Sequence, residues 1–198
     1  MFPRLNDLLL GRAFEGLRSE LLAGAEGRVL EIGSGTGLNF AHYGASVEVT
    51  AVEPSDFREA PRARARKKEA KARVSVAHGK AEALPFDAGS FDCVVSTFVL
   101  CSVRSVEASL AEARRVLKPG GRLLLLEHVR SRDPGVARWQ ERLRPVWMTV
   151  FGGCDPTRQL GPALDAAGFD PDGVEAVDLP LPRLARDGVM GVALTKPR

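Results

Sequence analysis

The chain has 198 residues, of which 44% are hydrophobic and 27% are charged, and its formal net charge is +3. This length favours one domain, 1–198, and the small charge gives no strong argument for a nucleic-acid partner. No apolar run approaches the roughly 20 residues of a membrane-spanning helix, so we expect a cytoplasmic protein without stable membrane insertion. The three cysteines, Cys93, Cys101 and Cys154, lack the spacing of a metal site, which favours free thiols and no bound metal.

The first predicted element is an amphipathic helix over residues 3–23, in which leucines recur at helical spacing. Three interpretations stay open for the segment 1–25 that contains it. It packs on the edge of the domain, or it forms a lid over the strand that follows. In the third interpretation it lies on a membrane surface, because Arg4, Arg12 and Arg18 flank the leucines.

Residues 29–40 read VLEIGSGTGLNF and predict a buried strand, a glycine loop and the start of a helix at 38–42. Gly33, Gly35 and Gly37 leave the loop with almost no side-chain bulk, so that a ligand can approach its backbone. Such a unit is either a cradle for a nucleotide-type ligand or a glycine-rich turn after a core strand. A dinucleotide fingerprint needs its third glycine at position 38, where this chain has Leu38, and the loop therefore favours a different ligand.

The stretch 46–53 (SVEVTAVE) predicts a second strand that ends at Glu53 and is followed by Pro54. An acid at the end of the second strand, about 20 residues beyond a glycine loop, is typical of a ribose-binding carboxylate. The alternative is an acid that stabilises the start of the next helix. That helix, 56–73, carries a run of arginines and lysines with Phe57 as its only aromatic residue, which favours a solvated face over a nucleic-acid site.

A third predicted strand at 74–77 is followed by the sequence HGKAEALPF at 78–86, and the apolar run 93–97 predicts a buried fourth strand. Ligands of open α/β sheets bind outside the carboxyl ends of the strands. We therefore expect Thr97 and Phe98 to touch the ligand. Cys101, a few residues further on, lies either in the pocket or packed as a small apolar residue.

Residues 105–117 predict an amphipathic helix that ends before Pro119 and two glycines, and a fifth strand follows at 122–129. Residues 133–151 predict a helix pair broken near Pro145. A helix over 156–167 comes next, with Asp155 as its cap and Gly168 as its stop. Strands at 174–178 and 189–196 complete the predicted order.

These motifs, in this order, resemble those of class I S-adenosylmethionine (SAM) methyltransferases: E-x-G-x-G-x-G at 31–37, an acid at 53 and LKPGG at 117–121. The resemblance implies an α/β, Rossmann-like fold with a mostly parallel seven-stranded sheet, helices on both faces and an antiparallel last strand. Lys80 stands where the family has an adenine-binding acid, so the adenine is expected at the backbone of Ala81 with Glu82 as an acceptor. The resemblance implies SAM as the cofactor, bound by Glu31, Gly33, Ser34, Gly35, Gly37, Asn39, Glu53, Pro54, Ala81, Glu82, Thr97 and Phe98.

More narrowly, the stretches 94–103, EHV at 127–129 and GGC at 152–154 with Arg158 resemble the methyltransferase-like thiol S-methyltransferases. This resemblance implies an enzyme that methylates a small-molecule acceptor, with a thiol as the best candidate. The segment 130–160 is then a helical insertion on the substrate side. The acceptor pocket is expected to contain Cys101, Trp139, Trp147, Cys154 and Arg158.

A thiol must lose its proton before it attacks, because the thiolate is the nucleophile. The candidate catalytic residues are His128 and Glu127, which strand alternation places on opposite faces, and a purely structural His128 is the alternative. Arg158 either binds an acidic group of the substrate or anchors Asp155. Two rival functions stay open: an O-, N- or C-methyltransferase acting on a lipid, quinone or other small molecule, and a SAM-binding protein without turnover. We expect a monomer or a weak homodimer.

Overall fold

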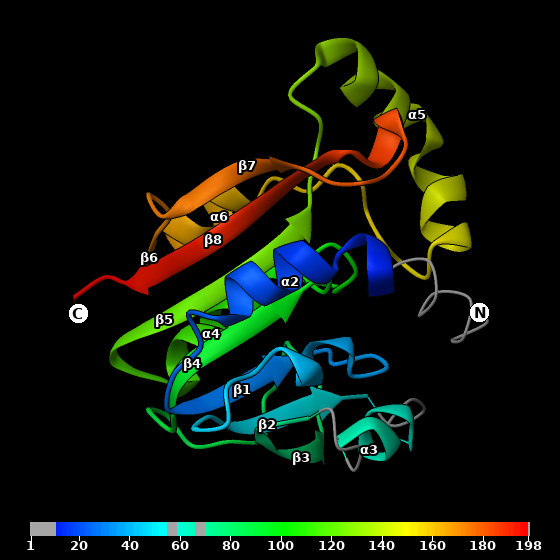
Figure 1. Ribbon diagram of the computed structural model, residues 1–198. Helices are drawn as coiled ribbons and strands as arrows, with labels where there is room; N and C mark the ends of the chain where they lie inside the picture. Colours follow the sequence, from blue (N-terminus) through cyan, green and yellow to red (C-terminus); the bar gives the residue numbers. More distant parts are fainter. Residues whose placement is uncertain (1–10, 55–58, 66–69, 198) are drawn as a thin grey trace.

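The molecule is built around one sheet with helices on both sides, and the computed structural model describes residues 11–54, 59–65 and 70–197 (Figure 1). The strands run in the spatial order β3-β2-β1-β4-β5-β8-β6, and β7 pairs with β8. The strands are β1 (Arg28–Ile32), β2 (Glu48–Glu53), β3 (Arg73–His78), β4 (Phe91–Thr97), β5 (Leu117–His128), β6 (Phe169–Asp170), β7 (Val174–Asp178) and β8 (Asp187–Thr195). The helices are α2 (Glu15–Leu22), α3 (Glu59–Ala65), α4 (Val106–Val116), α5 (Pro134–Val150) and α6 (Leu160–Ala166), with short 3-10 turns η1 (Leu38–Ala41) and η3 (Arg183–Ala185).

The predicted strand directions are confirmed, and the predicted number of strands is corrected. Strands β1 to β5 pair in parallel, and β8 runs antiparallel to β5. The described residues form eight strands instead of the expected seven, because Phe169 and Asp170 pair with Thr195 and Leu194 as the short strand β6. Two residues are too few to give a period in the sequence, and so this strand could not be predicted.

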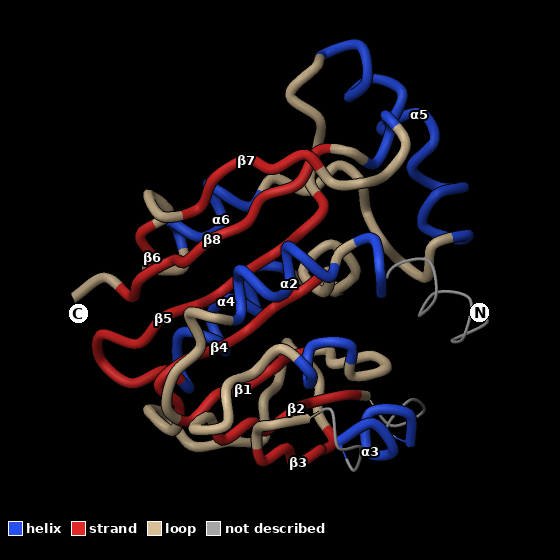
Figure 2. The backbone as a smooth tube through the Cα atoms, in the orientation of Figure 1, coloured by secondary structure: helices blue, strands red, loops and turns tan. Residues whose placement is uncertain are grey.

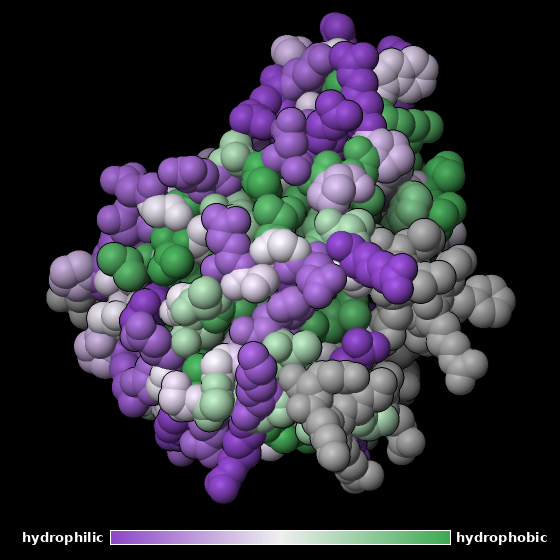
Figure 3. All heavy atoms as spheres, in the orientation of Figure 1, coloured by the Kyte–Doolittle hydropathy of each residue, from purple (hydrophilic) through white to green (hydrophobic). Residues whose placement is uncertain are grey.

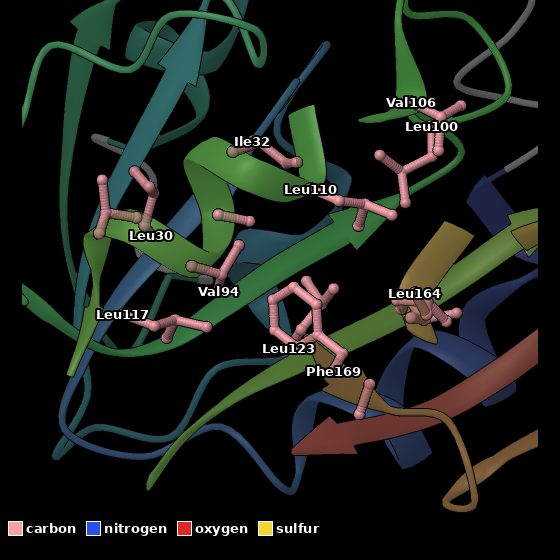
Figure 4. Packing of buried hydrophobic residues seen from close by; sticks show 14 of the residues in the cluster. Leu30, Ile32, Val94, Leu100, Val106, Leu110, Leu117, Leu123, Leu164 and Phe169 are labelled. Carbon is pink, nitrogen blue, oxygen red and sulfur yellow. The ribbon is translucent and has the colours of Figure 1, made fainter. Parts of the chain in front are cut away.

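Strand alternation divides the apolar residues into two cores, one on each face of the sheet. Leu30, Val94 and Leu123 face the side that α4 and α6 cover, where they meet Leu110 and Phe169 (Figure 4). Their chain neighbours point the other way and pack with α2 and the segment after the glycine loop. This second core includes Val29, Val95, Leu124, Leu22, Phe40 and Tyr43. A sheet that is buried on both faces explains the nearly continuous apolar runs of its central strands.

The helix predicted at 105–117 is α4, whose first turn is capped by Ser105 through a hydrogen bond from the Ala108 amide at 3.0 Å. The following strand begins earlier than predicted. Leu117 already pairs with Phe91, and the register shifts before Arg122 pairs with Cys93. The turn residues of LKPGG therefore lie within β5 as an irregularity.

Two predictions in the carboxyl-terminal half are wrong. The expected break near Pro145 does not occur, because α5 is one helix of 17 residues that contains this proline. Pro145 is exposed, so it removes one backbone hydrogen bond without forcing its ring into a packed neighbour. Asp155 does not cap the next helix, since α6 starts at Leu160 after Gln159. Gly168 does follow the end of α6, with a φ of 81°.

The amino-terminal prediction is met in part. Residues 1–10 of the expected helix lie outside the described residues, and its carboxyl-terminal part is α2. Helix α2 lies along the sheet beside β4 and β5 (Figures 1 and 2), and its Leu21 and Leu22 are buried. Of the basic helix predicted at 56–73, residues 59–65 form α3 and the rest is partly outside the described residues. The helix expected at 38–42 is a single 3-10 turn, η1.

The surface is polar over most of the face in view, and apolar residues gather beside α5 (Figure 3). The exposed large apolar side chains of this region are Trp139, Val146, Val150 and Phe151. Within the described part of the chain, no helix is both long and apolar enough to cross a bilayer.

Candidate functional site

The three glycines of the loop after β1 are required for different reasons. All three have a positive φ, between 54° and 78°. A Cβ atom on Gly33 would lie 2.6 Å from Val99, and one on Gly37 would lie 2.6 Å from Phe40, so the packing of the protein itself excludes side chains there. A Cβ atom on Gly35 would meet nothing within 4 Å. Gly35 thus faces open space, and it is the position where a ligand can lie against the backbone.

Glu53, at the carboxyl end of β2, closes the other side of this loop. Its Oε2 accepts a hydrogen bond from the Gly35 amide at 2.7 Å, and the residue is 7% exposed. Burial raises the pKa of Glu53, and the Gly35 N–H opposes the shift. Pro54, which follows, is exposed. We call residues 33–37 together with Glu53 the glycine cradle. Ser34 adds a buried hydroxyl that has no hydrogen-bond partner among the described residues.

Glu31 is buried beneath the glycine cradle and hydrogen-bonded within the protein. The residue is 1% exposed, and its carboxylate accepts hydrogen bonds from the Tyr43 hydroxyl at 2.7 Å and the Asn39 amide at 3.2 Å. Burial raises the pKa of Glu31 to about 7, against the opposing effects of Tyr43 and Arg18. Both Glu31 and Asn39 are buried under the loop, and their contact with the cofactor stays a prediction.

Sequence reasoning missed the two residues that complete this network. Tyr43 is fully buried beside Glu31, and Arg18 of α2 donates to Asn39 and to Thr97. The sequence does indicate that Arg18 is buried, because it lies one turn from Phe14 on the apolar face of an amphipathic helix. An arginine on such a face needs a buried partner.

Thr97 is the last residue of β4 and Phe98 follows it, so both lie at the carboxyl end of this strand, as predicted. Thr97 Oγ1 accepts a hydrogen bond from Asn39 at 2.9 Å. Phe98 has a φ of 58°, an unusual value for a residue with a side chain, and its amide donates to the Leu126 carbonyl at 2.9 Å. Its ring packs edge-on against Phe14 at 4.8 Å between centroids. Both residues are partly exposed, so they remain candidates for ligand contact.

Glu127 holds the turn that follows β4, and this corrects its predicted catalytic role. The carboxylate is fully buried and accepts from the Ser96 hydroxyl at 2.6 Å and from the backbone amides of Val99, Leu100 and Cys101 at 3.0 to 3.3 Å. Burial raises the pKa of Glu127, and these hydrogen bonds oppose the shift. A carboxylate enclosed by four donors cannot reach a substrate, so Glu127 is a positioning residue.

The structure leaves the predicted adenine contacts of Ala81 and Glu82 open. Ala81 and Glu82 are partly exposed on the segment that follows β3. One oxygen of Glu82 already accepts from the Arg104 amide at 2.8 Å. Glu82 therefore keeps one carboxylate oxygen for a ligand, and its role stays a prediction.

Beyond the end of β5, four side chains from distant parts of the chain meet. His128 Nδ1 lies 3.4 Å from Cys154 Sγ, and the His128 ring lies 6.1 Å from the Trp147 ring between centroids. Hydrogen bonding from the Cys101 thiol lowers the pKa of Cys154 well below that of an ordinary thiol, against burial, while His128 and Trp147 add to the lowering. The same contact, together with burial, raises the pKa of Cys101. We call Cys101, His128, Trp147 and Cys154 the sulfur cluster.

Two buried nitrogens in the sulfur cluster have no nitrogen or oxygen as a hydrogen-bond partner among the described residues. His128 is 4% exposed, and its Nε2 is buried and unpaired. The indole Nε1 of Trp147 is also buried and has no nitrogen or oxygen acceptor, but it lies near enough to Cys154 to lower the pKa of that thiol. Buried polar atoms are normally satisfied, so an unpaired pair of them indicates a place for a ligand group.

A backbone hydrogen bond holds the segment of Cys154 next to that of Cys101. The Asp155 amide donates to the Cys101 carbonyl at 2.7 Å. Burial opposes ionisation of Asp155, but hydrogen bonds from Arg144 and Thr157 lower its pKa to about 2. Arg158 donates to the Val103 carbonyl at 2.7 Å, and its Nε lies 3.7 Å from Asp155. Of the two predicted roles of Arg158, the anchoring role is the one that these contacts support.

Trp139 lies away from the sulfur cluster, which corrects its predicted place in the pocket. It is 54% exposed and stacks with the guanidinium of Arg142 at 5.5 Å. A separate groove of about 470 Å³ contains it, lined by Gly135, Val136, Arg138, Trp139, Arg142, Arg183 and Leu184.

Known proteins resemble this chain in sequence along most of its length. The protein family described as "Methyltransferase domain" matches residues 30–125. The human thiol S-methyltransferase TMT1A is 37% identical over 180 residues, which are 87% of this chain and 73% of that protein. The human thiol S-methyltransferase TMT1B is 37% identical over 195 residues, 91% of this chain and 80% of that protein. The ubiquinone/menaquinone biosynthesis C-methyltransferase UbiE of Methylobacterium nodulans is 35% identical over 68% of this chain and 57% of its own length.

Solved structures share the fold at lower identity. A SAM-dependent methyltransferase from Thermotoga maritima, described as a possible histamine N-methyltransferase, superposes with a TM-score of 0.68 at 24% identity, covering 98% of this chain and 95% of its own. The [4+2]-cyclase SpnF superposes with a TM-score of 0.73 at 21% identity, covering 95% and 81%. The fold is therefore that of the Rossmann-like methyltransferases, and at these identities the superposition speaks for the fold alone.

Proposed function

This chain belongs to the family of SAM-dependent methyltransferases that includes the two human thiol S-methyltransferases, and on that premise we propose that it methylates the sulfur of a small thiol. The proposal joins two parts of the molecule. The glycine cradle would hold the cofactor, and the sulfur cluster would receive the acceptor.

The residues of the glycine cradle fit this cofactor. The open side of Gly35 leaves room against the backbone, and Glu53 lies at the end of the neighbouring strand with one oxygen not engaged by Gly35. We assign Glu53 to the ribose hydroxyls, because a carboxylate can accept from both. Ser34, Gly35, Pro54, Ala81, Glu82, Thr97 and Phe98 are the further residues that we expect to line the cofactor. When bound, SAM supplies a methyl group on a cationic sulfur, which is the difficult part of the chemistry.

The observation that carries the acceptor proposal is the buried, unpaired Nε2 of His128, with the indole N–H of Trp147 beside it at Cys154. A buried imidazole at the end of β5 can take the proton of an acceptor thiol at Nε2, since its Nδ1 is directed at Cys154. The indole N–H of Trp147 can then donate to the thiolate and hold its direction. The sulfur–hydrogen bond of the acceptor would break, and a bond from its sulfur to the methyl carbon would form as the bond between that carbon and the cationic sulfur breaks. The acceptor would leave as a methyl thioether, and S-adenosylhomocysteine would be the second product. Positioning of this kind contributes roughly 7–11 kcal/mol in favourable systems.

Product analysis tests the proposal directly. The purified chain is incubated with SAM and a panel of alkyl and aryl thiols, phenols, amines and a quinol, and methylated products are measured by mass spectrometry. We expect small apolar thiols to turn over. The thiol proposal fails if a phenol, amine or quinol is methylated while the whole thiol set gives no product. SAM binding without any product would instead favour a protein that binds the cofactor without turnover.

The role of His128 has its own test. Turnover should rise with pH until the thiol or its base has titrated. His128→Asn should flatten or shift this profile, and SAM affinity measured by calorimetry should stay the same. An unaltered profile would remove His128 from the proton transfer and leave the thiol assignment intact.

A further inference from the structure

The sulfur cluster contains two thiols that are held side by side but differ in access. Cys101 is 2% exposed, whereas Cys154 is partly exposed. The hydrogen bond between the Asp155 amide and the Cys101 carbonyl, at 2.7 Å, joins the two segments beside the cysteines. A Cβ atom on Gly153 would lie only 3.6 Å from the Ser102 carbonyl, so the two backbones run together on this side as well. The two segments are therefore neighbours in the fold, which a disulfide between their cysteines requires.

The surroundings favour reaction at Cys154 rather than at Cys101. His128 Nδ1 lies 3.4 Å from the Cys154 sulfur, so its N–H can donate a hydrogen bond to a thiolate at that position. The lowered pKa of Cys154 and the raised pKa of Cys101 point the same way. The third cysteine, Cys93, is fully buried within β4, and burial raises its pKa to about 12. It is an inert comparison within the same chain.

We propose that Cys154 is a redox modification site: hydrogen peroxide oxidises it, and Cys101 closes onto it as an internal disulfide that switches off the acceptor side of the enzyme. In the first step the Cys154 thiolate attacks peroxide, a sulfur–oxygen bond forms and the oxygen–oxygen bond breaks. Cys154 becomes a sulfenic acid, and the peroxide is reduced to water once its leaving hydroxide takes a proton. In the second step the Cys101 sulfur attacks that of Cys154, the sulfur–sulfur bond forms, and hydroxide leaves with the Cys101 proton as water.

The consequence for function follows from what the disulfide connects. It would tie the turn after α5 to the turn after β4, and it would consume the thiolate that faces His128. The effect on methyl transfer rests on the proposed thiol methylation, whereas the disulfide itself does not. A dithiol reductant would reverse the change, since its two thiols return both protein thiols and become a disulfide themselves.

The disulfide is tested on the reduced, full-length chain without any acceptor thiol, because a thiol substrate would act as a reductant. The chain is treated with hydrogen peroxide, free thiols are blocked with N-ethylmaleimide, and the digested protein is analysed by mass spectrometry. We expect a peptide pair that links Cys101 to Cys154, with Cys93 blocked only after denaturation. Cys101→Ser should stop the reaction at a sulfenic acid on Cys154, which dimedone traps. Cys93→Ser is the matched control, and it should form the link as the unmodified chain does.

Activity and cofactor binding give the second measurement. Peroxide should lower the initial rate of methyl transfer about tenfold or more, measured while mass spectrometry still finds the link in the presence of the acceptor thiol. Treatment with a dithiol, removed before the assay, should restore the rate in both the unmodified chain and Cys93→Ser. SAM affinity should change little, because the glycine cradle lies on other strands. The proposal is overturned if peroxide produces no link between Cys101 and Cys154, or if the link forms and methyl transfer is unchanged. A chain that forms the link but methylates no thiol would contradict the proposed function and leave the modification site standing.

Discussion

The glycine cradle and the sulfur cluster lie at the same end of the sheet but are built in different ways. The glycine cradle comes from one continuous loop and a single acid, Glu53, which a 2.7 Å hydrogen bond joins to Gly35. The sulfur cluster takes Cys101 from the turn after β4 and His128 from the end of β5. Trp147 comes from α5, and Cys154 comes from the turn that follows α5. A local unit can be placed by its backbone alone, whereas a dispersed one needs supporting contacts from several elements.

Two buried carboxylates make this difference concrete. Glu31, under the glycine cradle, is satisfied by the side chains of Tyr43 and Asn39. Glu127, beside the sulfur cluster, is satisfied mainly by backbone amides of the turn that ends at Cys101. Each acid is buried and hydrogen-bonded within the protein, so its effect on stability and its effect on binding can be separated by experiment.

The largest expected effect comes from filling the open side of the glycine cradle. Gly35→Val should lower SAM affinity by about a hundredfold or more, about 2.7 kcal/mol, because the new side chain occupies the space that the cofactor needs. Isothermal titration calorimetry measures this. Gly89→Val is a matched control, since Gly89 also has a positive φ of 67° with nothing near its Cβ position. Equal SAM affinity in the two variants would remove Gly35 from the cofactor site.

A smaller loss is expected from the acid of the glycine cradle. Glu53→Ala should weaken SAM binding by about 1.5–3 kcal/mol, the usual contribution of hydrogen bonds to a charged group. Calorimetry on the folded variant measures it, and Glu48→Ala, exposed at the other end of β2, serves as the control. A lower melting temperature with unchanged affinity would show that Glu53 only stabilises the loop.

Beside the sulfur cluster, the hydrogen bonds of Glu127 can be removed by substitution. Glu127→Gln should lower the free energy of unfolding by about 1–3 kcal/mol, because its amide group would face backbone and hydroxyl donors. Urea denaturation measures the loss. Glu141→Gln, which removes an exposed ion pair with Arg130, should cost less than about 1 kcal/mol. Similar values for the two variants would contradict the positioning role of Glu127.

Glu31 gives the cradle side a pH dependence of its own. Its carboxyl titrates near 4.5 in the unfolded chain and near about 7 in the folded protein. Between these values the folded chain binds more protons, so its stability should fall as the pH rises, by up to about 1.4 kcal/mol per pH unit. Urea denaturation between these pH values should show a flatter profile for Glu31→Gln, with Glu48→Gln as the control. Parallel profiles for the unmodified chain and Glu31→Gln would refute the shift.

The smallest effect separates the two tryptophans of α5. Trp139→Ala should change kcat/KM for the thiol by less than about twofold, because its ring lies in a separate groove. Trp147→Ala should lower kcat/KM about tenfold through loss of a donor and a wall of the acceptor site. Steady-state kinetics with one thiol compare them. A larger loss in Trp139→Ala than in Trp147→Ala would move the acceptor away from the sulfur cluster.

Sequence by itself determined the cofactor end of this protein. The strand, the glycine loop and the acid at position 53 are patterns of neighbouring residues, and their local backbone preferences are enough to predict them. The same reasoning predicted the α4 helix, the central strands and the opposite faces of Glu127 and His128. It failed where the context of the folded protein overrules local preference: Pro145 stays within α5, and the two-residue strand β6 forms only by pairing with β8.

Only the tertiary structure decided what each chemically active side chain does. Glu31 and Glu127 look like ligand-facing acids in the sequence, but the packing around them turns both into internal supports. Trp139 and Trp147 are alike in the sequence, yet α5 places them in different surroundings. The meeting of Cys101 with Cys154 depends on one backbone hydrogen bond between segments about 50 residues apart, which no local pattern encodes. Long-range contacts of this kind arise from the packing of whole elements, and the proposed acceptor side of the molecule rests on them.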